Sequence, residues 1–285
     1  MPELPEVEIV KRSLIKIANK AKIIDIKIKN KNLRYKIPNN FRTILLNKKI
    51  IKITRKSKYI IFHLNKGVLL LHLGMTGKVL VVKKKSNEIF KTSFYYDLNI
   101  IPKHNHVYFF LNNNMVLIYN DVRRFGFFKL YKNISQITFL NKLGPEPLSE
   151  KFNYNYFKEI VKKYKKNIKN LLMDQSFVSG LGNIYVNEVL HITKISPLKI
   201  SNILKDVEIK KLISKIKIIL KVAILKGGSS IQDFKNTSGE NGSFQQLFKV
   251  YGRENKKCSR ISCKGKIKRI LISNRSSFFC DLCQK

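Results

Sequence analysis

Residues 59–82 read YIIFHLNKGVLLLHLGMTGKVLVV, and this stretch decides the fold class. Three short apolar runs follow one another in it, Tyr59–Leu64, Val68–Leu73 and Lys78–Val82, and a glycine-containing break separates each from the next. Runs of this length, rich in branched and aromatic residues and bounded by glycine, are typical of β-strands. Several short strands joined by tight turns predict a β-sandwich.

The β pattern continues on both sides of this stretch. Before it, isoleucines alternate with polar residues over Ile24–Ile28. After it, Val107–Leu111 and Met115–Tyr119 flank three asparagines, which is a hairpin signal. We therefore expect β-structure from Lys22 to about Lys132.

Helical patterns lie at both ends of this β region. The segment from Pro5 to about Lys20 begins with a proline suited to a first helical turn and places an apolar stripe on one face. A linker signal at Gly144–Pro147 precedes four further helical stretches, Tyr154–Lys165, Ile168–Gln175, Asn183–His191 and Asp206–Lys226. The outline is a β domain, a helical domain and a small tail that carries all four cysteines.

The chain is strongly basic. It has 57 Lys and Arg against 18 Asp and Glu, a net charge of +39, which attracts a polyanion, with nucleic acid the first candidate and a membrane surface the second. An AT-rich genome imposes the same abundance of Lys, Ile and Asn on any protein, so the charge alone leaves the partner open.

Two observations bear on location. Acidic residues at positions 3, 6 and 8 occupy the place of the basic start of a signal peptide. No uncharged apolar run approaches the roughly 20 residues that cross a bilayer. We expect a soluble, intracellular protein without a membrane partner.

The cysteines form two pairs, Cys258 with Cys263 and Cys280 with Cys283. Two thiolate pairs separated by a hairpin-like segment are typical of a tetrahedral zinc site rather than a disulfide framework. Four sulfur ligands leave no open coordination position, so the predicted zinc ion is structural.

The chain opens on Met1-Pro2-Glu3-Leu4-Pro5-Glu6. Removal of Met1 would leave Pro2 as a terminal secondary amine. An α-amine has a pKa near 8, so an appreciable fraction is unprotonated at neutral pH and can attack the C1′ atom of a deoxyribose. Glu3 can then supply general acid–base chemistry. Taken by itself, the same stretch also fits an ordinary helix entry.

Six motifs in one order remove this ambiguity: Pro2–Glu8, Lys56–Tyr59, His72–Gly77, Arg123–Gly126, Gly180–Tyr185 and Val250–Arg253. With the cysteine tail, they closely resemble bacterial formamidopyrimidine-DNA glycosylases over essentially the whole chain. The resemblance implies an α+β fold with an N-terminal β-sandwich and flanking helices, a helix–two-turn–helix domain and a C-terminal β-hairpin zinc finger. The corresponding domains are a catalytic domain at 1–133, a DNA-binding domain at 134–235, and a lesion-capping loop with the finger at 236–285.

The implied function is base-excision repair. Such an enzyme removes oxidised purines, 8-oxoguanine and formamidopyrimidines, from damaged double-stranded DNA, and cleaves the abasic site by elimination through a Schiff base on Pro2. The resemblance also implies a monomer with one structural zinc ion, located in the bacterial cytoplasm with the nucleoid.

The family roles carry over to individual positions. In the implied catalytic set, Pro2 is the nucleophile, Glu3 the proton donor and acceptor, Lys58 an active-site phosphate contact and Arg275 the finger residue that grips phosphate. The implied DNA-binding residues are Met75, Arg123, Phe125, Lys169, Asn183 and Tyr251. Of these, Met75, Arg123 and Phe125 would fill the space that a flipped nucleotide leaves, and Asn183 would bind a phosphate beside the lesion. The polar stretch Ser229–Ser243 would cover the extruded base.

The sequence departs from the family pattern in two places. Four residues separate Cys258 from Cys263, whereas the usual spacing is two, so the first knuckle must bulge. Val122 stands where the family commonly has proline.

Two alternative functions remain. An endonuclease VIII-like enzyme would remove oxidised pyrimidines, but Leu4 and the Met75, Arg123 and Phe125 set favour the purine-directed branch. A non-catalytic basic zinc protein that binds nucleic acid would explain the charge and the finger, yet it leaves Pro2, Glu3 and Lys58 without a role.

Overall fold

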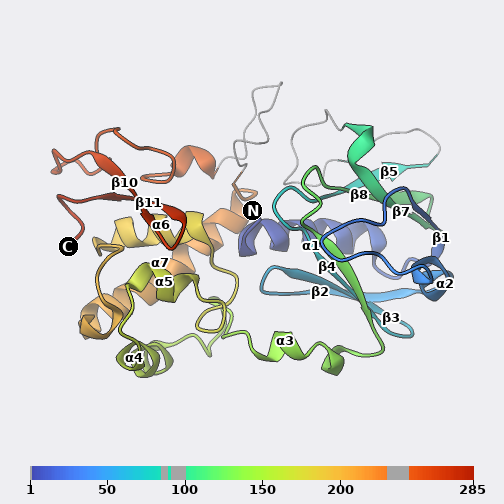
Figure 1. The fold of residues 1–285 in the computed structure, drawn as a ribbon, viewed down its shortest axis with the longest axis horizontal. Coiled ribbons are helices and arrows are strands. Elements are labelled where there is room, and N and C mark those ends of the chain that lie inside the picture. Colours follow the sequence, from blue (N-terminus) through green and yellow to red (C-terminus); the bar gives the residue numbers. More distant parts are fainter. Residues whose placement is uncertain (1, 85–88, 91–100, 230–243) are drawn as a thin grey trace. The chain divides into compact units, whose positions relative to one another are not determined.

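The computed structural model describes residues 2–84, 89–90, 101–229 and 244–285 (Figure 1). The chain divides into two compact units, one formed by Met1–Leu140 with Lys226–Gln245 and the other by Asn141–Leu225 with Gln246–Lys285. The expected domain boundaries after residues 133 and 235 remain predictions. None of the described helices is both long and apolar enough to cross a membrane.

The first unit is built on two antiparallel sheets, which confirms the predicted β-sandwich. The larger sheet has the order β1-β7-β8-β5-β6, formed by Ile23–Ile28, Asn105–Leu111, Met115–Asn120, Lys78–Lys83 and Ile89–Phe90. The smaller has the order β2-β3-β4-β9, formed by Ile50–Lys56, Tyr59–Leu64, Val68–His72 and Phe127–Tyr131. The predicted hairpin of three asparagines joins β7 to β8.

Two helices complete the core of this unit. Helix α1 (Leu4–Ala18) packs on β2 and β3 and buries its apolar stripe, as predicted. Helix α2 (Phe41–Leu45) shows that the expectation of β-structure throughout residues 22–132 was wrong at this point. Phe41 and Leu45 lie one helical turn apart and both are fully buried, so the core selects a helical turn here.

The second unit contains four longer helices and the tail hairpin. The helices are α4 (Tyr154–Lys163), α5 (Ile168–Met173), α6 (Asn183–Thr193) and α7 (Asp206–Leu225), each at a predicted helical stretch. Strands β10 (Ile267–Ile272) and β11 (Arg275–Cys280) pair through a two-residue turn in which Ser273 and Asn274 have φ of 48° and 57°. Positive φ at both central residues is the conformation that matches the twist of a tight hairpin.

Short segments connect these elements. Helix α3 is Thr138–Asn141, and single 3₁₀ turns lie at Pro102–His104, Ile134–Gln136, Ser201–Ile203 and Gln245–Leu247.

Candidate active site and metal centre

Pro2 and Glu3 lie at the entry of helix α1, and both are buried. The Glu3 backbone N–H donates to one oxygen of the Glu6 carboxylate at 2.9 Å. The other Glu6 oxygen accepts the backbone N–H of Ser229 at 2.8 Å and its hydroxyl at 3.0 Å. Glu6 therefore fixes the backbone beside Pro2 against the segment that ends at Ser229.

Lys58 lies in the turn between β2 and β3 and is only 7% exposed. Ser57, just before it, has a φ of 54°, in the left-handed region. The Arg55 guanidinium donates to the Ser57 carbonyl at 2.8 Å and to the Glu8 carboxylate of α1 at 2.9 Å. Burial opposes ionisation of Glu8, but hydrogen bonds from three cationic side chains, Arg55 among them, outweigh it and hold the pKa of this carboxyl below its usual value. The ion pair thus connects the Lys58 turn to the helix that Pro2 and Glu3 begin.

His72, to which the sequence assigned no role, ends strand β4. Its ring stacks on Phe127, with the centroids 5.3 Å apart, and its Nδ1 accepts the Gly74 N–H at 3.1 Å, which places the ring proton on Nε2. Burial, assisted by the positive charges of Lys58 and Arg34, lowers the pKa of His72 to about 4. His72 therefore offers a neutral N–H donor within range of the Lys58 charge. Its place at the start of the motif His72–Gly77 was the only available signal.

The three predicted void-filling residues lie on two loops of the first unit. Met75 follows β4, whereas Arg123 and Phe125 follow β8. Phe125 is 41% exposed, and the Arg123 guanidinium lies 4.7 Å from the centre of its ring. An exposed aromatic ring with a guanidinium group over it can contact a base through stacking and hydrogen bonds together.

A buried carboxylate, Asp121, connects these two loops. It accepts hydrogen bonds from the Thr76 hydroxyl at 2.5 Å, the Tyr119 hydroxyl at 2.9 Å and the Gly126 N–H at 2.8 Å. The Thr76 hydroxyl oxygen also accepts the Arg123 N–H at 3.0 Å. A Cβ atom at position 126 would lie 1.7 Å from the Tyr119 hydroxyl, so only glycine fits there. Asp121 thereby fixes the backbone that carries the exposed side chains.

In the second unit, Lys169, Asn183 and Arg275 converge on the start of strand β11. The Ser276 carbonyl accepts the Lys169 ammonium at 3.1 Å and the Asn183 amide at 2.9 Å, and Lys169 also donates to the Ser277 hydroxyl at 2.6 Å. Burial lowers the pKa of Lys169 to about 8, assisted by the Arg275 charge. Arg275 itself is exposed. Lys169 is only 1% exposed, so its side chain is buried below the residues that are predicted to contact phosphate. Its contact with DNA stays a prediction.

Tyr251 packs edge-on against Phe278 of the hairpin, with the ring centroids 5.2 Å apart. The chain around it is held by Glu188 of α6, whose carboxylate accepts the backbone N–H groups of Lys249, Val250 and Tyr251 at 2.8–3.0 Å. Desolvation raises the pKa of Glu188 despite these three hydrogen bonds. Both units therefore contain a buried carboxylate that accepts several hydrogen bonds, Asp121 from two loops and strand β8, and Glu188 from one loop.

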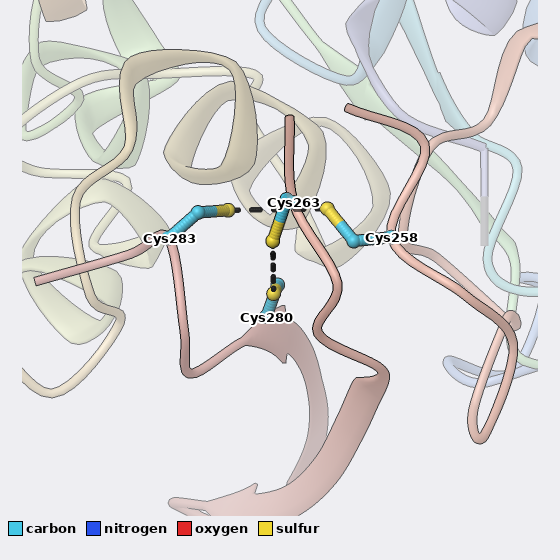
Figure 2. Close-up of side chains that lie close together, drawn as sticks. All are labelled: Cys258, Cys263, Cys280 and Cys283. Atoms are coloured by element: carbon cyan, nitrogen blue, oxygen red, sulfur yellow. Dashed lines mark hydrogen bonds between the residues drawn. The ribbon is translucent and has the colours of Figure 1, made fainter. Parts of the chain in front are cut away.

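The four cysteine sulfurs lie within 4.8 Å of one another (Figure 2). Cys258 and Cys283 are 3.9 Å apart, and Cys263 and Cys280 are 3.6 Å apart. A tetrahedral ion with Zn–S bonds of about 2.3 Å requires S···S distances of roughly 3.8 Å, so the four thiols fit a zinc ion. Gly265 leaves the necessary room, since a Cβ atom there would lie 2.6 Å from the Cys280 sulfur. This group could hold a metal ion.

The candidate residues divide between the two units. Pro2, Glu3, Lys58, Met75, Arg123 and Phe125 belong to the first, and Lys169, Asn183, Tyr251, Arg275 and the four cysteines belong to the second. The stretch expected to cap the lesion lies outside the described residues except for Ser229.

Comparison with known proteins identifies the domains and the family of the chain. Residues 1–128 match the formamidopyrimidine-DNA glycosylase N-terminal domain, and residues 143–235 match the formamidopyrimidine-DNA glycosylase H2TH domain. Formamidopyrimidine-DNA glycosylases of Dinoroseobacter shibae and Haemophilus influenzae are each 39% identical to this chain, which is covered completely, as are 100% and 99% of the two relatives.

Two solved structures of the Lactococcus lactis protein have similar folds. One is a variant in complex with DNA containing Fapy-dG, with a TM-score of 0.85, 36% identity and complete coverage of both chains. The other is bound noncovalently to DNA with an abasic site, with a TM-score of 0.83, 36% identity and 99% coverage of both chains. The fold, the motifs and the full-length similarity together place this chain in the formamidopyrimidine-DNA glycosylase family.

Proposed function

We propose that this protein is a bifunctional DNA glycosylase of base-excision repair. It removes oxidised purines, 8-oxoguanine and formamidopyrimidines, from double-stranded DNA and then cleaves the abasic site. The observation that carries this proposal is the buried pair Pro2–Glu3 at the entry of α1, with the backbone between them held by Glu6. The solved relatives bound to Fapy-dG and abasic DNA support both the substrate and the product.

Pro2 is the proposed nucleophile. After Met1 is removed, its amine attacks C1′ while the glycosidic bond breaks, and the leaving base takes the bonding pair and a proton. Loss of the amine proton and opening of the C1′–O4′ bond give an iminium, and Glu3 protonates O4′. The iminium acidifies the C2′ proton, whose loss expels the 3′ phosphate. A further elimination releases the 5′ phosphate.

Phosphate contacts come from both units. Lys58 supplies positive charge. The His72 ring is neutral, so its Nε2–H donates a hydrogen bond without bringing a second titrating proton to the site. Arg275 and Asn183 act from the second unit, Arg275 at the start of β11 and Asn183 at the start of α6. Lys169 holds the Ser276 carbonyl and thereby orients its neighbour Arg275.

Arg123 reads the base opposite the lesion, while Met75 and Phe125 fill the vacated space. Unstacking one base costs a few kcal/mol, which these side chains offset. Duplexes with 8-oxoguanine opposite cytosine should be processed much faster than those with adenine opposite. Arg123→Ala should flatten this preference, whereas a strong preference for oxidised pyrimidines would favour the endonuclease VIII-like alternative.

The ion that the four cysteines hold is proposed to be a single structural zinc. When bound, it fixes the hairpin that presents Arg275, and no step of the chemistry passes through it. We place the enzyme in the bacterial cytoplasm with the nucleoid and expect it to act as a monomer.

Borohydride trapping tests the mechanism. It reduces an iminium to a stable amine, so it should link the protein to an 8-oxoguanine duplex, and peptide mapping should find the adduct on Pro2. Glu3→Gln should impair base excision more than cleavage at a preformed abasic site. An adduct on Lys58, or full activity in protein that retains Met1, would contradict the assignment, because Met1 would make the Pro2 nitrogen an amide.

A further inference from the structure

The unusual first knuckle of the cysteine site has contacts with helix α6 that neither the motifs nor the proposed function explain. The spacer between Cys258 and Cys263 is Ser259-Arg260-Ile261-Ser262, twice the usual family length. Ile261 is completely exposed, so the spacer does not bury itself through its apolar residue. The structure shows two polar contacts from this knuckle to α6 instead.

The first contact joins a cysteine sulfur to a histidine. His191 on the last turn of α6 is 2% exposed, and its Nε2 lies 3.5 Å from Cys258 Sγ. Its Nδ1 has no hydrogen-bond partner in the part of the chain that the structure describes. A metal-bound thiolate is an acceptor, so a ring proton on Nε2 points at the sulfur, whereas a proton on Nδ1 would set two lone pairs against each other.

The second contact joins the spacer to the end of the helix. The Arg260 guanidinium donates to the carbonyls of His191 at 2.5 Å and Ile192 at 3.1 Å. Carbonyls in the last turn of a helix lack partners within the helix, and a cation there also interacts favourably with the helix dipole. Arg260 thus binds the end of α6 with its side chain.

We propose that His191 and Arg260 are positioning residues of the metal centre: His191 donates an N–H···S hydrogen bond to the Cys258 thiolate, and Arg260 fastens the widened knuckle to the end of α6. This inference rests on the proposed zinc. The two contacts place Cys258 where a four-residue spacer by itself would leave it loosely held. The His191 hydrogen bond also withdraws electron density from the sulfur, which makes the thiolate a poorer target for oxidants and protects the metal.

Metal release from the full-length, zinc-loaded protein to excess chromophoric chelator tests this proposal. Groups that orient metal ligands typically contribute 10–100-fold to metal affinity. His191→Phe keeps an aromatic ring but removes the donor, and we expect about 10–100-fold weaker zinc binding. His191→Gln keeps an N–H at the same distance along the side chain and should stay close to the parent. Arg260→Met should weaken binding in the same direction by a smaller factor.

Lys264→Met is the matched control, since it removes an exposed cation beside Cys263 and should leave metal binding unchanged. Cobalt(II) substitution gives a second readout that does not depend on stability. The parent should show a four-thiolate spectrum, and His191→Phe should move the sulfur-to-cobalt charge-transfer band to lower energy because the sulfur lone pairs lose their donor.

Three results would overturn this proposal while leaving the proposed metal in place. One is equal zinc affinity in the parent, His191→Phe and Arg260→Met, which leaves the zinc assignment standing. Another is equal weakening in His191→Gln and His191→Phe, which indicates packing alone. The third is a cobalt spectrum with three sulfurs and one nitrogen, which makes His191 a ligand. A parent protein that binds no zinc would remove the proposed metal itself together with this inference.

Discussion

The β-sandwich and the cysteine finger keep their functional side chains in place by different means. Among its described residues, the sandwich has a continuous cluster of 28 buried apolar residues, including Phe41, Leu71 and Phe128. The cluster under the finger has five, and two of these are the cysteines Cys258 and Cys280. Burial of apolar area can therefore stabilise the sandwich by itself, while we expect the finger to depend on the proposed metal ion and on its polar contacts with α6.

Removing the metal should produce the largest difference between the response of the finger and the response of the sandwich. Cys280→Ser eliminates one thiolate, and structural zinc contributes roughly 10–16 kcal/mol in isolated finger peptides. We expect zinc content to fall from about one per chain to none, and damaged-DNA affinity to fall with it. Hydrogen exchange should show lost protection at residues 248–285 and unchanged protection in the strands of the sandwich. Persistent protection of the metal-free finger would contradict the comparison.

Truncation of a core side chain should have the opposite effect, since it should destabilise the sandwich and leave the metal site unchanged. Phe41→Ala removes a fully buried ring that contacts Phe109 and Phe128, and such changes cost about 3–5 kcal/mol. Thermal unfolding of the sandwich should move to lower temperature while zinc stoichiometry stays the same. Ile261→Ala, at a completely exposed position, is the control and should change neither quantity.

The two buried carboxylates allow a matched test. Asp121→Asn and Glu188→Gln each turn an acceptor of several hydrogen bonds into an amide that must set its own donor against one of them, at about 1–3 kcal/mol. Asp121→Asn should weaken the preference for cytosine opposite 8-oxoguanine, since it releases the loop of Arg123. Glu188→Gln should weaken DNA binding and leave that preference intact. Identical effects of both substitutions on base preference would mean that neither carboxylate acts only through the loop that it contacts.

The smallest expected effect is a pH dependence that belongs to the sandwich. The folded pKa of His72, about 4, lies below the value of 6.5 in the unfolded chain, so the unfolded state takes up the proton first as the pH falls. The contribution to stability is complete well above pH 6.5 and is lost as the pH falls towards 4, and the loss is about 1.4 kcal/mol at pH 5.5. His72→Phe keeps the stacking on Phe127 and should flatten this part of the profile in chemical denaturation. An unchanged slope would assign the acid sensitivity to other groups.

The sequence predicted those elements whose pattern is local. Strands β3, β4 and β5 follow from apolar runs between glycine-containing breaks, and α6 and α7 from their periodicity, with ends displaced by one or two residues. Helix α2 was missed because five residues are too few to establish a helical period, and only the buried contacts of Phe41 and Leu45 determine it.

The site could be predicted as a set of residues but not as a set of contacts. Pro2, Glu3 and the cysteines stand out by their chemistry and spacing. The role of Asp121 depends on partners at positions 76, 119 and 126, which sequence order does not bring together. Lys169 looks like any other lysine in a chain this basic, and only the structure shows its amine bonded to the hairpin. The role of His72 depends on which ring nitrogen carries the proton, and the hydrogen bond from the Gly74 N–H determines this.

Helix α6 touches the tail at successive turns, with Asn183 bonded to the Ser276 carbonyl, Asn187 to the Phe278 N–H, Glu188 to the chain around Val250 and His191 to Cys258. The finger is consequently not an interchangeable part. A finger transplanted from a relative would meet an unmatched helix face, so a productive chimera must exchange α6 and the tail together. Evolution of the protein is subject to the same constraint. Substitutions on α6 and substitutions in the finger are therefore expected to be selected as pairs.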